Sequence, residues 1–381
     1  MHKRGGWLLA AVLGGLLAGC GGKAEAPSAT APAKPGVAMD EERVLNIYNW
    51  TDYIVPDILS GFENEYGIKI NYDVFDSNEV VETKLLAGNT GYDIVVPSAS
   101  FMQRQITAGA FQKLDKSLLS NLGNLDPEIS RQVAANDPGN QYGVNYFWGT
   151  DGVGYNAAVI KQIMPDAPVD SLRMFYDPNV VKNFQKCGVT ILDAPDEVVG
   201  TVLIYLGRNP DSESTEDLKA AEKVLLSIRP YIRYINSSKY IEDLANGEIC
   251  LSLGWSGDVS QAKARAREAG KDLDIRYSIP KEGSITFYDT MVIPIDAPHP
   301  KNAHLFINYM MRPENAARNS SMIRYATGNS AAYKLIDPKV YNDPNIFPPA
   351  EMMSHLHPNV ARSQTFTREL NRTWTRFKTG Q

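Results

Sequence analysis

Strand-like and helix-like segments alternate at the start of the body of this chain, and that alternation restricts the fold more than any other feature. Residues 44–50 and 68–75 have the apolar patterning of strands. Residues 57–66 and 78–87 carry apolar side chains at helical spacing, and a glycine follows each segment. A short apolar strand over residues 92–97 comes next, with another helix behind it. This βαβαβα order has short connections and predicts a parallel sheet covered by helices on both faces.

The rest of the chain predicts a second α/β unit. A glycine-punctuated strand is expected over residues 142–155, and the remaining helices and apolar runs lie at 178–185, 197–206, 214–228, 249–253, 274–279, 290–295 and 301–311. A length of 381 residues is enough for two domains. We expect one lobe from residues 43–147 plus about 285–325. The second lobe is expected from residues 148–284 plus about 326–381, with extended chain crossing between the two.

The first twenty residues predict export and lipid anchoring. Lys3 and Arg4 precede an apolar run of 13 residues, which is shorter than the ~20 residues of a membrane-spanning helix. The run ends in Leu-Ala-Gly-Cys, which resembles the bacterial lipobox, so residues 1–19 are expected to be a signal peptide and Cys20 a lipidated residue. Gly, Ala and Pro make up twelve of the next twenty residues, which predicts a flexible tether over 20–42.

Composition excludes several classes of protein. Hydrophobic residues are 43% and charged residues 22% of the chain, which is typical of a globular protein and not of a disordered or multi-span membrane protein. The net charge of −6 provides no basic field, so we expect no nucleic-acid partner. Once Cys20 is lipidated, Cys187 and Cys250 remain in an oxidising compartment. An even pair there favours a disulfide, with two buried free thiols as the alternative.

Three motifs resemble enzyme or metal sites, and each lacks a necessary part. The glycines of Gly152-Val-Gly154 lie in mid-chain and are better explained by a strand that crosses between lobes than by a dinucleotide loop. The motif from Gly254 to Asp258 has Asp where a nucleophile elbow needs a final Gly. His355-x-His357 has no further metal-binding companion. We therefore expect no enzyme, no cofactor and no metal.

Aromatic and acidic side chains gather instead at the ends of the predicted strands and helices. The clusters are Trp50-Thr51-Asp52-Tyr53, Asp196-Glu197, Trp255 with Asp258, Phe287-Tyr288-Asp289, and Tyr325. In open α/β sheets ligands bind outside the carboxyl ends of the strands, so these clusters can converge. For any single member, core packing or exposure to solvent is the plainer explanation. The pairing of a ring with an acid recurs four times, and this recurrence points to a common site.

Such a site suits an alkyl diamine. A ring face attracts an ammonium group by roughly 0.5–2 kcal/mol, and a carboxylate adds a charge-assisted hydrogen bond. Methylene groups packed between rings contribute about 0.8 kcal/mol each. Removing water from an ammonium group is costly, so each end of the ligand needs its own acid. An amino acid would call for an Arg opposite its carboxylate, and none stands beside the clusters that contain an acid.

Longer motifs carry a resemblance to a known family. They are Y-N-W-T-D-Y-I from Tyr48, F-D-S-N-E-V from Phe75, Y-D-I-V-V-P-S-A-S from Tyr92, L-D-A-P-D-E-V from Leu192, Y-I-E-D-L-A-N-G-E-I-C from Tyr240, G-W-S-G-D-V from Gly254 and S-I-P-K-E-G from Ser278. Over residues 43–380 the chain resembles the extracytoplasmic polyamine-binding proteins of ABC importers, and most closely the putrescine-binding branch. The resemblance implies an α/β fold, a type II periplasmic-binding-protein clamshell of two lobes. Each lobe is then a mixed sheet flanked by helices, without enzymatic activity.

The resemblance also assigns ligand-binding residues. They are Trp50, Thr51, Asp52, Tyr53 and Ser98 in the first lobe, Glu197, Trp255 and Asp258 in the second, Phe287 and Asp289 near the hinge, and Tyr325. Asp258 and Asp289 are expected to bind ammonium directly, and Glu197 to engage the other end of the ligand directly or through water. The resemblance further implies that Cys187 and Cys250 are paired.

Three positions depart from the putrescine branch. Thr51 stands where that branch often has Ser, Tyr288 replaces a Phe, and Asp151 replaces a neutral residue. Tyr288 and Asp151 leave the preferred ligand length open, because an extra acid would favour a longer polyamine if it faced the cleft.

We therefore expect a lipid-anchored receptor for putrescine that hands its ligand to an ABC permease. It would lie in the periplasm or on the outer face of the cytoplasmic membrane, touch the membrane only through its lipid, and be a monomer. The alternatives are a polyamine sensor with the same site and a receptor that prefers spermidine, cadaverine or agmatine. An exported amine-processing enzyme, or a receptor for sugars, iron or amino acids, would be a different class of protein.

Overall fold

The fold comes from a computed structural model that describes residues 42–381. The predicted signal peptide over 1–19, the lipidation site Cys20 and nearly all of the predicted tether lie outside the described residues. Within them, no helix is both long and apolar enough to cross a membrane.

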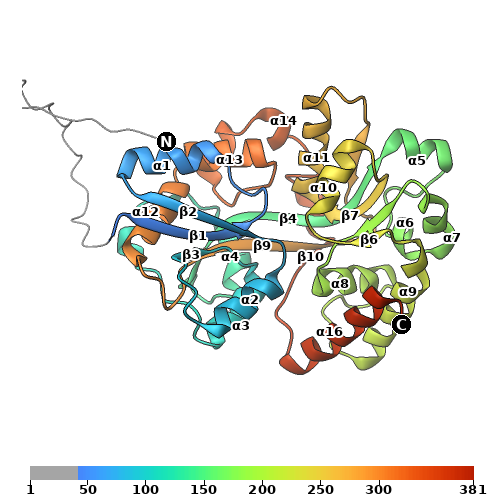
Figure 1. The fold of residues 1–381 in the computed structure, drawn as a ribbon, viewed down its shortest axis with the longest axis horizontal. Helices are drawn as coiled ribbons and strands as arrows, with labels where there is room; N and C mark the ends of the chain where they lie inside the picture. The colour runs from blue at the N-terminus through green and yellow to red at the C-terminus, as the bar shows by residue number, and fades with distance from the viewer. Residues whose placement is uncertain (1–41) are drawn as a thin grey trace, which may run out of the picture. The chain divides into compact units, whose positions relative to one another are not determined.

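A ten-stranded sheet runs through the described part of the chain, with the order β2-β1-β3-β9-β4-β7-β5-β6 (Figure 1). The remaining two strands of the ten lie off this path: β10 pairs with β9, and β8 pairs with β4. The strands are β1 (Val44–Trp50), β2 (Lys69–Phe75), β3 (Ile94–Val95), β4 (Gly143–Asn156), β5 (Val189–Ile191), β6 (Tyr234–Ile235), β7 (Leu251–Trp255), β8 (Ile275–Ser278), β9 (Ser284–Val292) and β10 (Leu356–Pro358).

Helices cover the sheet in both halves of the structure (Figure 1). The α-helices are α1 (Pro56–Tyr66), α2 (Asn78–Ala87), α3 (Ala99–Thr107), α4 (Pro127–Ala134), α5 (Ala157–Ile163), α6 (Arg173–Tyr176), α7 (Pro178–Val181), α8 (Pro195–Tyr205), α9 (Thr215–Ile228), α10 (Lys239–Asn246), α11 (Ser256–Glu268), α12 (Pro300–Met310), α13 (Pro313–Ile323), α14 (Pro338–Tyr341), α15 (Ala350–Met353) and α16 (Gln364–Thr379). Short 3₁₀ helices are η1 (Lys116–Leu118), η2 (Leu122–Asn124), η3 (Lys182–Phe184), η4 (Arg229–Tyr231) and η5 (Ser330–Leu335).

The first three strands pair in parallel, as the sequence predicts. β9 and β4 then continue this half as antiparallel neighbours. The helices seal the half with apolar side chains. Phe62 of α1 packs against Phe306 of α12 at a ring-centroid distance of 5.1 Å, and both rings are buried.

β4 is the strand on which the two halves of the sheet meet. Its first residues, Gly143–Thr150, pair with β9, and Asp151–Asn156 pair with β7 and β8. Gly152 and Gly154 are required here. A Cβ at position 152 would lie 2.5 Å from the Tyr277 ring, and a Cβ at position 154 would lie 2.6 Å from Val259. The glycine motif is thus part of a strand, as predicted, and does not form a cofactor loop.

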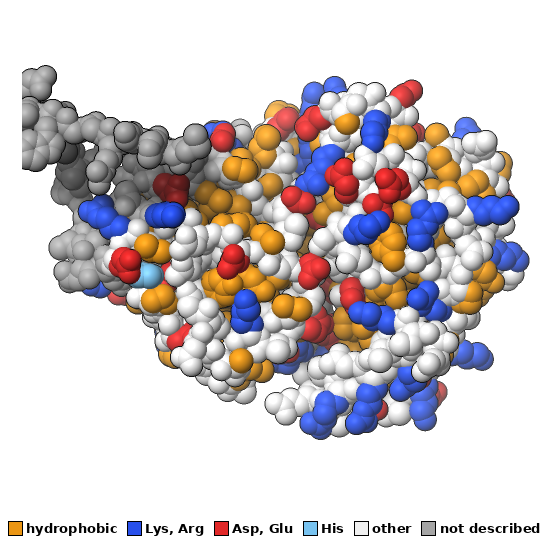
Figure 2. Space-filling view, in the orientation of Figure 1, with side chains coloured by type: hydrophobic (Ala, Val, Ile, Leu, Met, Phe, Trp, Pro, Cys, Tyr) orange, Lys and Arg blue, Asp and Glu red, His pale blue; other side chains and the backbone are white. Residues whose placement is uncertain are grey.

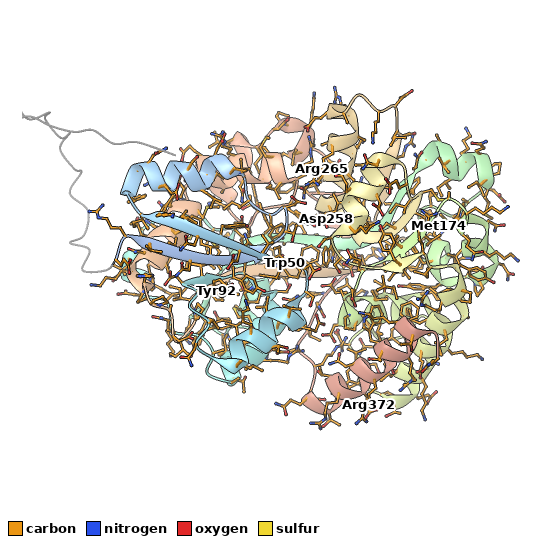
Figure 3. All side chains as sticks on the ribbon, in the orientation of Figure 1. Trp50, Tyr92, Met174, Asp258, Arg265 and Arg372 are labelled. Atoms are coloured by element: carbon orange, nitrogen blue, oxygen red, sulfur yellow. A yellow bond between two sulfur atoms is a disulfide. The ribbon has the colours of Figure 1, made fainter. Side chains whose placement is uncertain are left out.

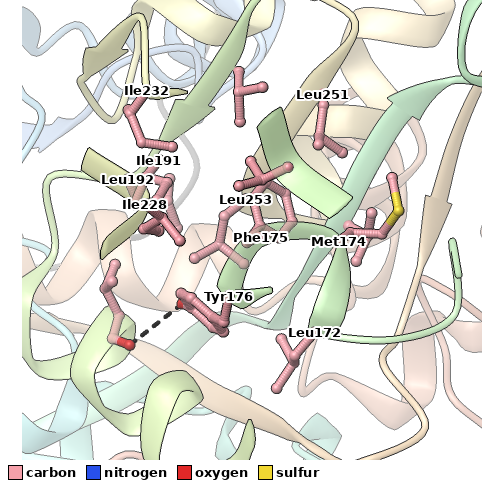
Figure 4. Close-up of a cluster of buried hydrophobic side chains, with 14 of the residues drawn as sticks. Leu172, Met174, Phe175, Tyr176, Ile191, Leu192, Ile228, Ile232, Leu251 and Leu253 are labelled. Carbon is pink, nitrogen blue, oxygen red and sulfur yellow. Dashed lines mark hydrogen bonds between the residues drawn. The ribbon is translucent and has the colours of Figure 1, made fainter. Parts of the chain in front are cut away.

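The second half has its own hydrophobic core, which is shown in Figure 4. Phe175, Ile191 and Leu253 belong to this core, together with side chains from α8, α9 and α16. α16 presents Phe366, Leu370, Trp374 and Phe377 to it. These residues share one helix face by their spacing. Lys and Arg side chains gather on the outer side of α16 (Figure 2).

The predicted lobe boundaries remain a proposal, and two late segments pack in different places. Residues near Ala326 stay with the first half, because Trp148 N donates to Ala326 O at 2.9 Å and η5 contacts α13. α16, in contrast, packs against α8 and α9.

A disulfide joins Cys187 to Cys250, so the predicted pairing is confirmed. The two Cα atoms are 5.5 Å apart, and the bridge ties the start of β5 to the start of its neighbour β7. It closes a large loop, since the cysteines are separated by 63 positions in the sequence.

Replacing Cys187 and Cys250 together by Ser should lower the free energy of unfolding by about 2–4 kcal/mol, because the unfolded chain regains the entropy of the open loop. Urea unfolding of the variant and the wild type measures this difference. The wild type with a reductant should lose a similar amount. An unchanged free energy of unfolding in both experiments would contradict the prediction.

Candidate functional site

A cavity of about 420 Å³, counted with its mouth, lies between the two halves of the sheet. It is bordered by the C-terminal ends of β1 and β7, by β9, and by the starts of α3, α8, α10 and α11. Its lining residues are Trp50, Thr51, Tyr53, Phe75, Ser98, Glu197, Ser237, Ser238, Ile241, Trp255, Asp258, Phe287, Asp289 and Tyr325. The structure thus brings together ten of the eleven predicted ligand-binding residues, and their binding role stays a prediction.

Strand ends place the two tryptophans of the site. Trp50 is the last residue of β1, and its indole Nε1 donates to Val96 O at 2.8 Å, which fixes the ring. Trp255 ends β7, and its ring centroid lies 5.6 Å from that of Trp50 in an edge-to-face contact. Figure 3 shows Trp50 and Asp258 near the centre of the molecule.

Aromatic rings continue from this pair as a connected row. Phe287 lies 6.1 Å from Trp255 and 6.0 Å from Tyr325, measured between ring centroids. Tyr325 in turn lies 5.0 Å from Tyr53. Such offset and edge-to-face arrangements leave ring faces available for packing and for cations.

Asp289 is a buried carboxylate held by two hydroxyl groups. Tyr53 Oη donates to it at 2.6 Å and Ser98 Oγ at 2.7 Å. Asn78 fixes Ser98 by accepting from its backbone N–H and donating to its Oγ, each at 3.0 Å. Burial raises the pKa of Asp289 to about 6, although the hydrogen bonds from Tyr53 and Ser98 act in the opposite direction.

Asp258 is held in a similar way on the other half of the sheet. Tyr325 Oη donates to it at 2.6 Å and Tyr240 Oη at 2.8 Å. It lies in the first turn of α11, where the helix dipole favours a negative charge. Burial nevertheless raises its pKa to about 7, against the effect of both tyrosines and of the Arg265 charge.

Glu197 supplies a third buried carboxylate. It lies in the first turn of α8 and accepts a hydrogen bond from Trp255 Nε1 at 2.8 Å. Burial raises its pKa as well, and the nearby Asp289 charge adds to the rise. Among residues 42–381, no Lys, Arg or His forms an ion pair with Glu197, Asp258 or Asp289. The row of rings therefore carries acids that the described protein does not neutralise.

Asp52 is the one predicted site residue that does not line the cavity. Its carboxylate forms an ion pair with Arg265 of α11 at 3.0 Å, and its side chain is 41% exposed. Arg265 lies on α11, above Asp258 in Figure 3. Acidic and hydrophobic side chains gather along the middle of the surface seen in Figure 2. Asp52 thus belongs to the rim, where it links the turn after β1 to α11.

Sequence reasoning missed four lining residues, which are Phe75, Ser237, Ser238 and Ile241. Phe75 ends β2 directly opposite Trp50 of β1, with their ring centroids 4.6 Å apart, so strand pairing was the signal that would have found it. Ser237 and Ser238 precede α10 and lie outside the family motifs, whereas Ile241 lies in the first turn of α10 and within the motif that begins at Tyr240.

The departures at Tyr288 and Asp151 both fall outside the lining. The Tyr288 ring stacks on Trp148 at a centroid distance of 6.2 Å. Asp151 is buried, interacts with Glu197 and does not line the cavity.

A profile described as "Bacterial extracellular solute-binding protein" matches residues 58–348. The putrescine-binding periplasmic protein PotF of Escherichia coli is 47% identical over 348 residues, which cover 91% of this chain and 94% of PotF. The putrescine-binding periplasmic protein SpuD of Pseudomonas aeruginosa is 46% identical over 342 residues, covering 90% and 93%.

Solved structures agree in fold. A structure from Listeria monocytogenes has a TM-score of 0.81 at 32% identity and covers 89% of this chain and all of its own. The spermidine/putrescine substrate-binding protein PotD of Streptococcus pneumoniae has a TM-score of 0.71 at 30% identity and covers 89% and 99%. The predicted α/β periplasmic-binding-protein fold is therefore confirmed.

Without ligand, the protein should become less stable as the pH rises from about 5 to about 7. Asp258 and Asp289 hold protons in the folded state at pH values where the unfolded chain has lost them, because burial raises both pKa values. Each group then costs up to about 1.4 kcal/mol per pH unit across this range. The variant Asp258→Asn should show a shallower loss, and differential scanning calorimetry across the range measures it.

The exposed Asp166→Asn variant is the matched control for this experiment, and it should follow the wild type. If Asp258→Asn and the wild type lost stability in parallel over the whole range, the buried carboxylate would not be the cause.

Proposed function

This chain belongs to the extracytoplasmic polyamine-binding branch of the bacterial extracellular solute-binding proteins, and we propose that it captures putrescine and delivers it to an ABC permease. The family consists of binding proteins and not of enzymes. One observation carries the proposal, which is the row of rings with three buried carboxylates that no basic side chain of residues 42–381 neutralises. Two relatives that align with nearly the whole chain, PotF and SpuD, are both named for putrescine.

The arrangement of donors and rings supports a dication with an apolar middle. Asp258 accepts a hydrogen bond from Tyr325, and Asp289 accepts one from Tyr53. Because the rings of these two tyrosines are in contact, both acids bind the same end of the ligand. Glu197 is attached to Trp255 at the other end of the ring row. The methylene chain then packs against Trp255 and Phe287, where each buried methylene contributes about 0.8 kcal/mol.

The chemistry of the lining disfavours the other solute classes. In the described part of the chain, no Lys, Arg or His lines the cavity. An amino acid would leave its carboxylate unpaired and close to three acids, which is repulsive. A sugar would leave the buried acids without a counter-charge, whereas an ammonium group provides one together with hydrogen-bond donors.

A ligand is expected to close the two predicted lobes, because residues of both lobes line the cavity. Trp50 and Tyr53 belong to the first predicted lobe, whereas Glu197, Trp255 and Asp258 belong to the second. A ligand held by both sets favours the closed form by as much as it binds that form better. The Asp52–Arg265 ion pair spans the same two parts at the rim and adds at most about 1 kcal/mol, because both side chains are partly exposed.

The lipid anchor is part of the same proposal and is supported by the sequence Leu-Ala-Gly-Cys at residues 17–20. A lipid on Cys20 would hold the protein at a membrane outside the cytoplasm. A coil the length of the predicted tether spans about 25 Å, which lets the folded body reach a permease in the same membrane.

Isothermal titration calorimetry against a panel of solutes tests the function. The panel holds putrescine, cadaverine, agmatine, spermidine, two amino acids and two sugars. We expect putrescine to bind most tightly, and amino acids and sugars not to bind. Tighter binding of any amino acid or sugar, or turnover of putrescine by the purified protein, would contradict the proposal.

Replacing Asp289 by Asn should weaken putrescine binding at least tenfold, because a buried charge-assisted hydrogen bond is worth about 1.5–3 kcal/mol. Asp52→Asn makes the same chemical change at the rim and should cost less than about threefold. Calorimetry on both variants measures the contrast. Equal losses would remove Asp289 from the site.

Replacing Cys20 by Ser should release the protein from the membrane fraction of expressing cells, because no thiol remains to carry the lipid. Fractionation and metabolic labelling with radioactive palmitate measure this. A Cys20→Ser variant that still sediments with membranes would contradict the lipid anchor, while its putrescine affinity should stay unchanged.

A further inference from the structure

Asp151 is a buried acid that the binding site as described does not use. It lies on β4 at the residue that pairs with Trp255 of β7, and its side chain is only 1% exposed. Its own carbonyl oxygen accepts a hydrogen bond from Ser284 Oγ at 2.5 Å. Pairing with β7 on one side and the hydrogen bond from Ser284 hold this backbone in place beneath the surface.

No donor within residues 42–381 satisfies the Asp151 carboxyl group. No described N–H or hydroxyl group donates to either of its oxygens, and no described Lys, Arg or His forms an ion pair with it. Two tyrosines are close enough to feel its charge, but their hydroxyls are engaged. Tyr176 Oη bonds to Thr201 Oγ1 at 2.6 Å, and Tyr277 Oη donates to Thr150 O at 2.8 Å.

The neighbour of this carboxyl group is Glu197, which lines the cavity. Asp151 pairs with Trp255, whose indole donates to Glu197. Burial raises the pKa of Asp151 well above its usual range, and the charge of Glu197 and a side-chain hydrogen bond with it act in the same direction. Two carboxylates in contact without a cation cannot both be ionised, so a proton must lie between them.

The other charged groups around the pair are acidic. Asp289 of β9, Glu79 of α2 and Asp196 of α8 all act on Glu197 and favour retention of protons. Arg104 of α3 pairs with Glu82 at 3.1 Å and with Asp196 at 3.8 Å, and does not reach the pair.

Hydrogen bonding decides which of the two acids keeps the proton. Glu197 already accepts a hydrogen bond from Trp255 Nε1, which stabilises its ionised form. Asp151 has no such donor. The asymmetry favours a protonated Asp151 beside an ionised Glu197 when a cation occupies the cavity.

We propose that Asp151 remains a neutral carboxylic acid, donates a hydrogen bond to the Glu197 carboxylate, and is a positioning residue for the cationic end of the ligand. The inference rests on the proposed function. The proton stays on Asp151 when ligand binds, so the pair carries a single negative charge and matches a single ammonium group. Asp151 therefore adds no charge for a third amine, and the site is built for a diamine rather than for a longer polyamine.

Two substitutions distinguish Asp151 as a neutral hydrogen-bond donor from Asp151 as a second ionised carboxylate. Asp151→Asn keeps the shape and a donor and should leave putrescine affinity within about threefold of the wild type. Asp151→Leu removes the donor and should weaken binding at least tenfold, which corresponds to the worth of a buried hydrogen bond to a charged group. Asp166→Asn, at an exposed position, is the control and should change nothing.

Difference infrared spectroscopy tests the protonation state directly. At about pH 8, where ordinary carboxyl groups are ionised, the putrescine-bound wild type should keep a C=O band of a protonated carboxylic acid. The band should be absent in Asp151→Asn and present in Asp166→Asn. This measurement does not depend on whether Asp151→Leu folds.

Two results would overturn the inference. One is a putrescine-bound wild type without that band, or with a band that survives Asp151→Asn. The other is an Asp151→Asn variant that loses affinity as much as Asp151→Leu, or an Asp151→Leu variant that folds and loses none. Failure of the wild type to bind any polyamine would instead refute the proposed function, and the band in the unliganded protein would still be compared with that of Asp151→Asn.

Discussion

The rest of this structure depends on one constraint, which is the burial of carboxylate groups that have no basic side chain to pair with. Moving a charged group out of water is costly unless hydrogen bonds and an opposite charge replace the water. Hydroxyl groups of Tyr53, Ser98, Tyr240 and Tyr325 and the indole N–H of Trp255 provide the hydrogen bonds. The described side chains provide no opposite charge at the cavity, and a cationic solute is the partner that completes the balance.

The same residues hold the acids and shape the space between them. Tyr53 and Tyr325 donate to Asp289 and Asp258 through their hydroxyls, while their rings belong to the aromatic row. Trp255 does the same for Glu197. A substitution of one of these rings would therefore remove an apolar wall and release a carboxylate together. This coupling makes the site rigid, and rigidity lowers the entropy lost when a slim, flexible ligand is bound.

β4 positions several aromatic and acidic side chains around the candidate site. Gly149 and Gly152 allow Phe287, Tyr325 and Tyr277 to approach the strand where any Cβ would collide with them. The same strand carries Asp151, which interacts with Glu197 of the cavity lining. The strand that joins the two halves of the sheet thus also supports side chains of the candidate site, which connects the folding of the sheet to the geometry of binding.

Local pattern in the sequence predicted the first three strands with their helices and the parallel start of the sheet, but not α10, α11, α13 or α16. The disulfide pairing and ten of the cavity residues came from motifs that the chain shares with a known family. These features depend on periodicity, on residue chemistry and on motifs that are continuous along the chain. Tertiary structure alone decided that Asp52 lies at the rim with Arg265, that Phe75 and the start of α10 close the cavity, and that Asp151 interacts with Glu197. Each of these placements depends on which distant segment of the chain packs against the side chain. Such long-range contacts cannot be predicted from the local sequence around the residue.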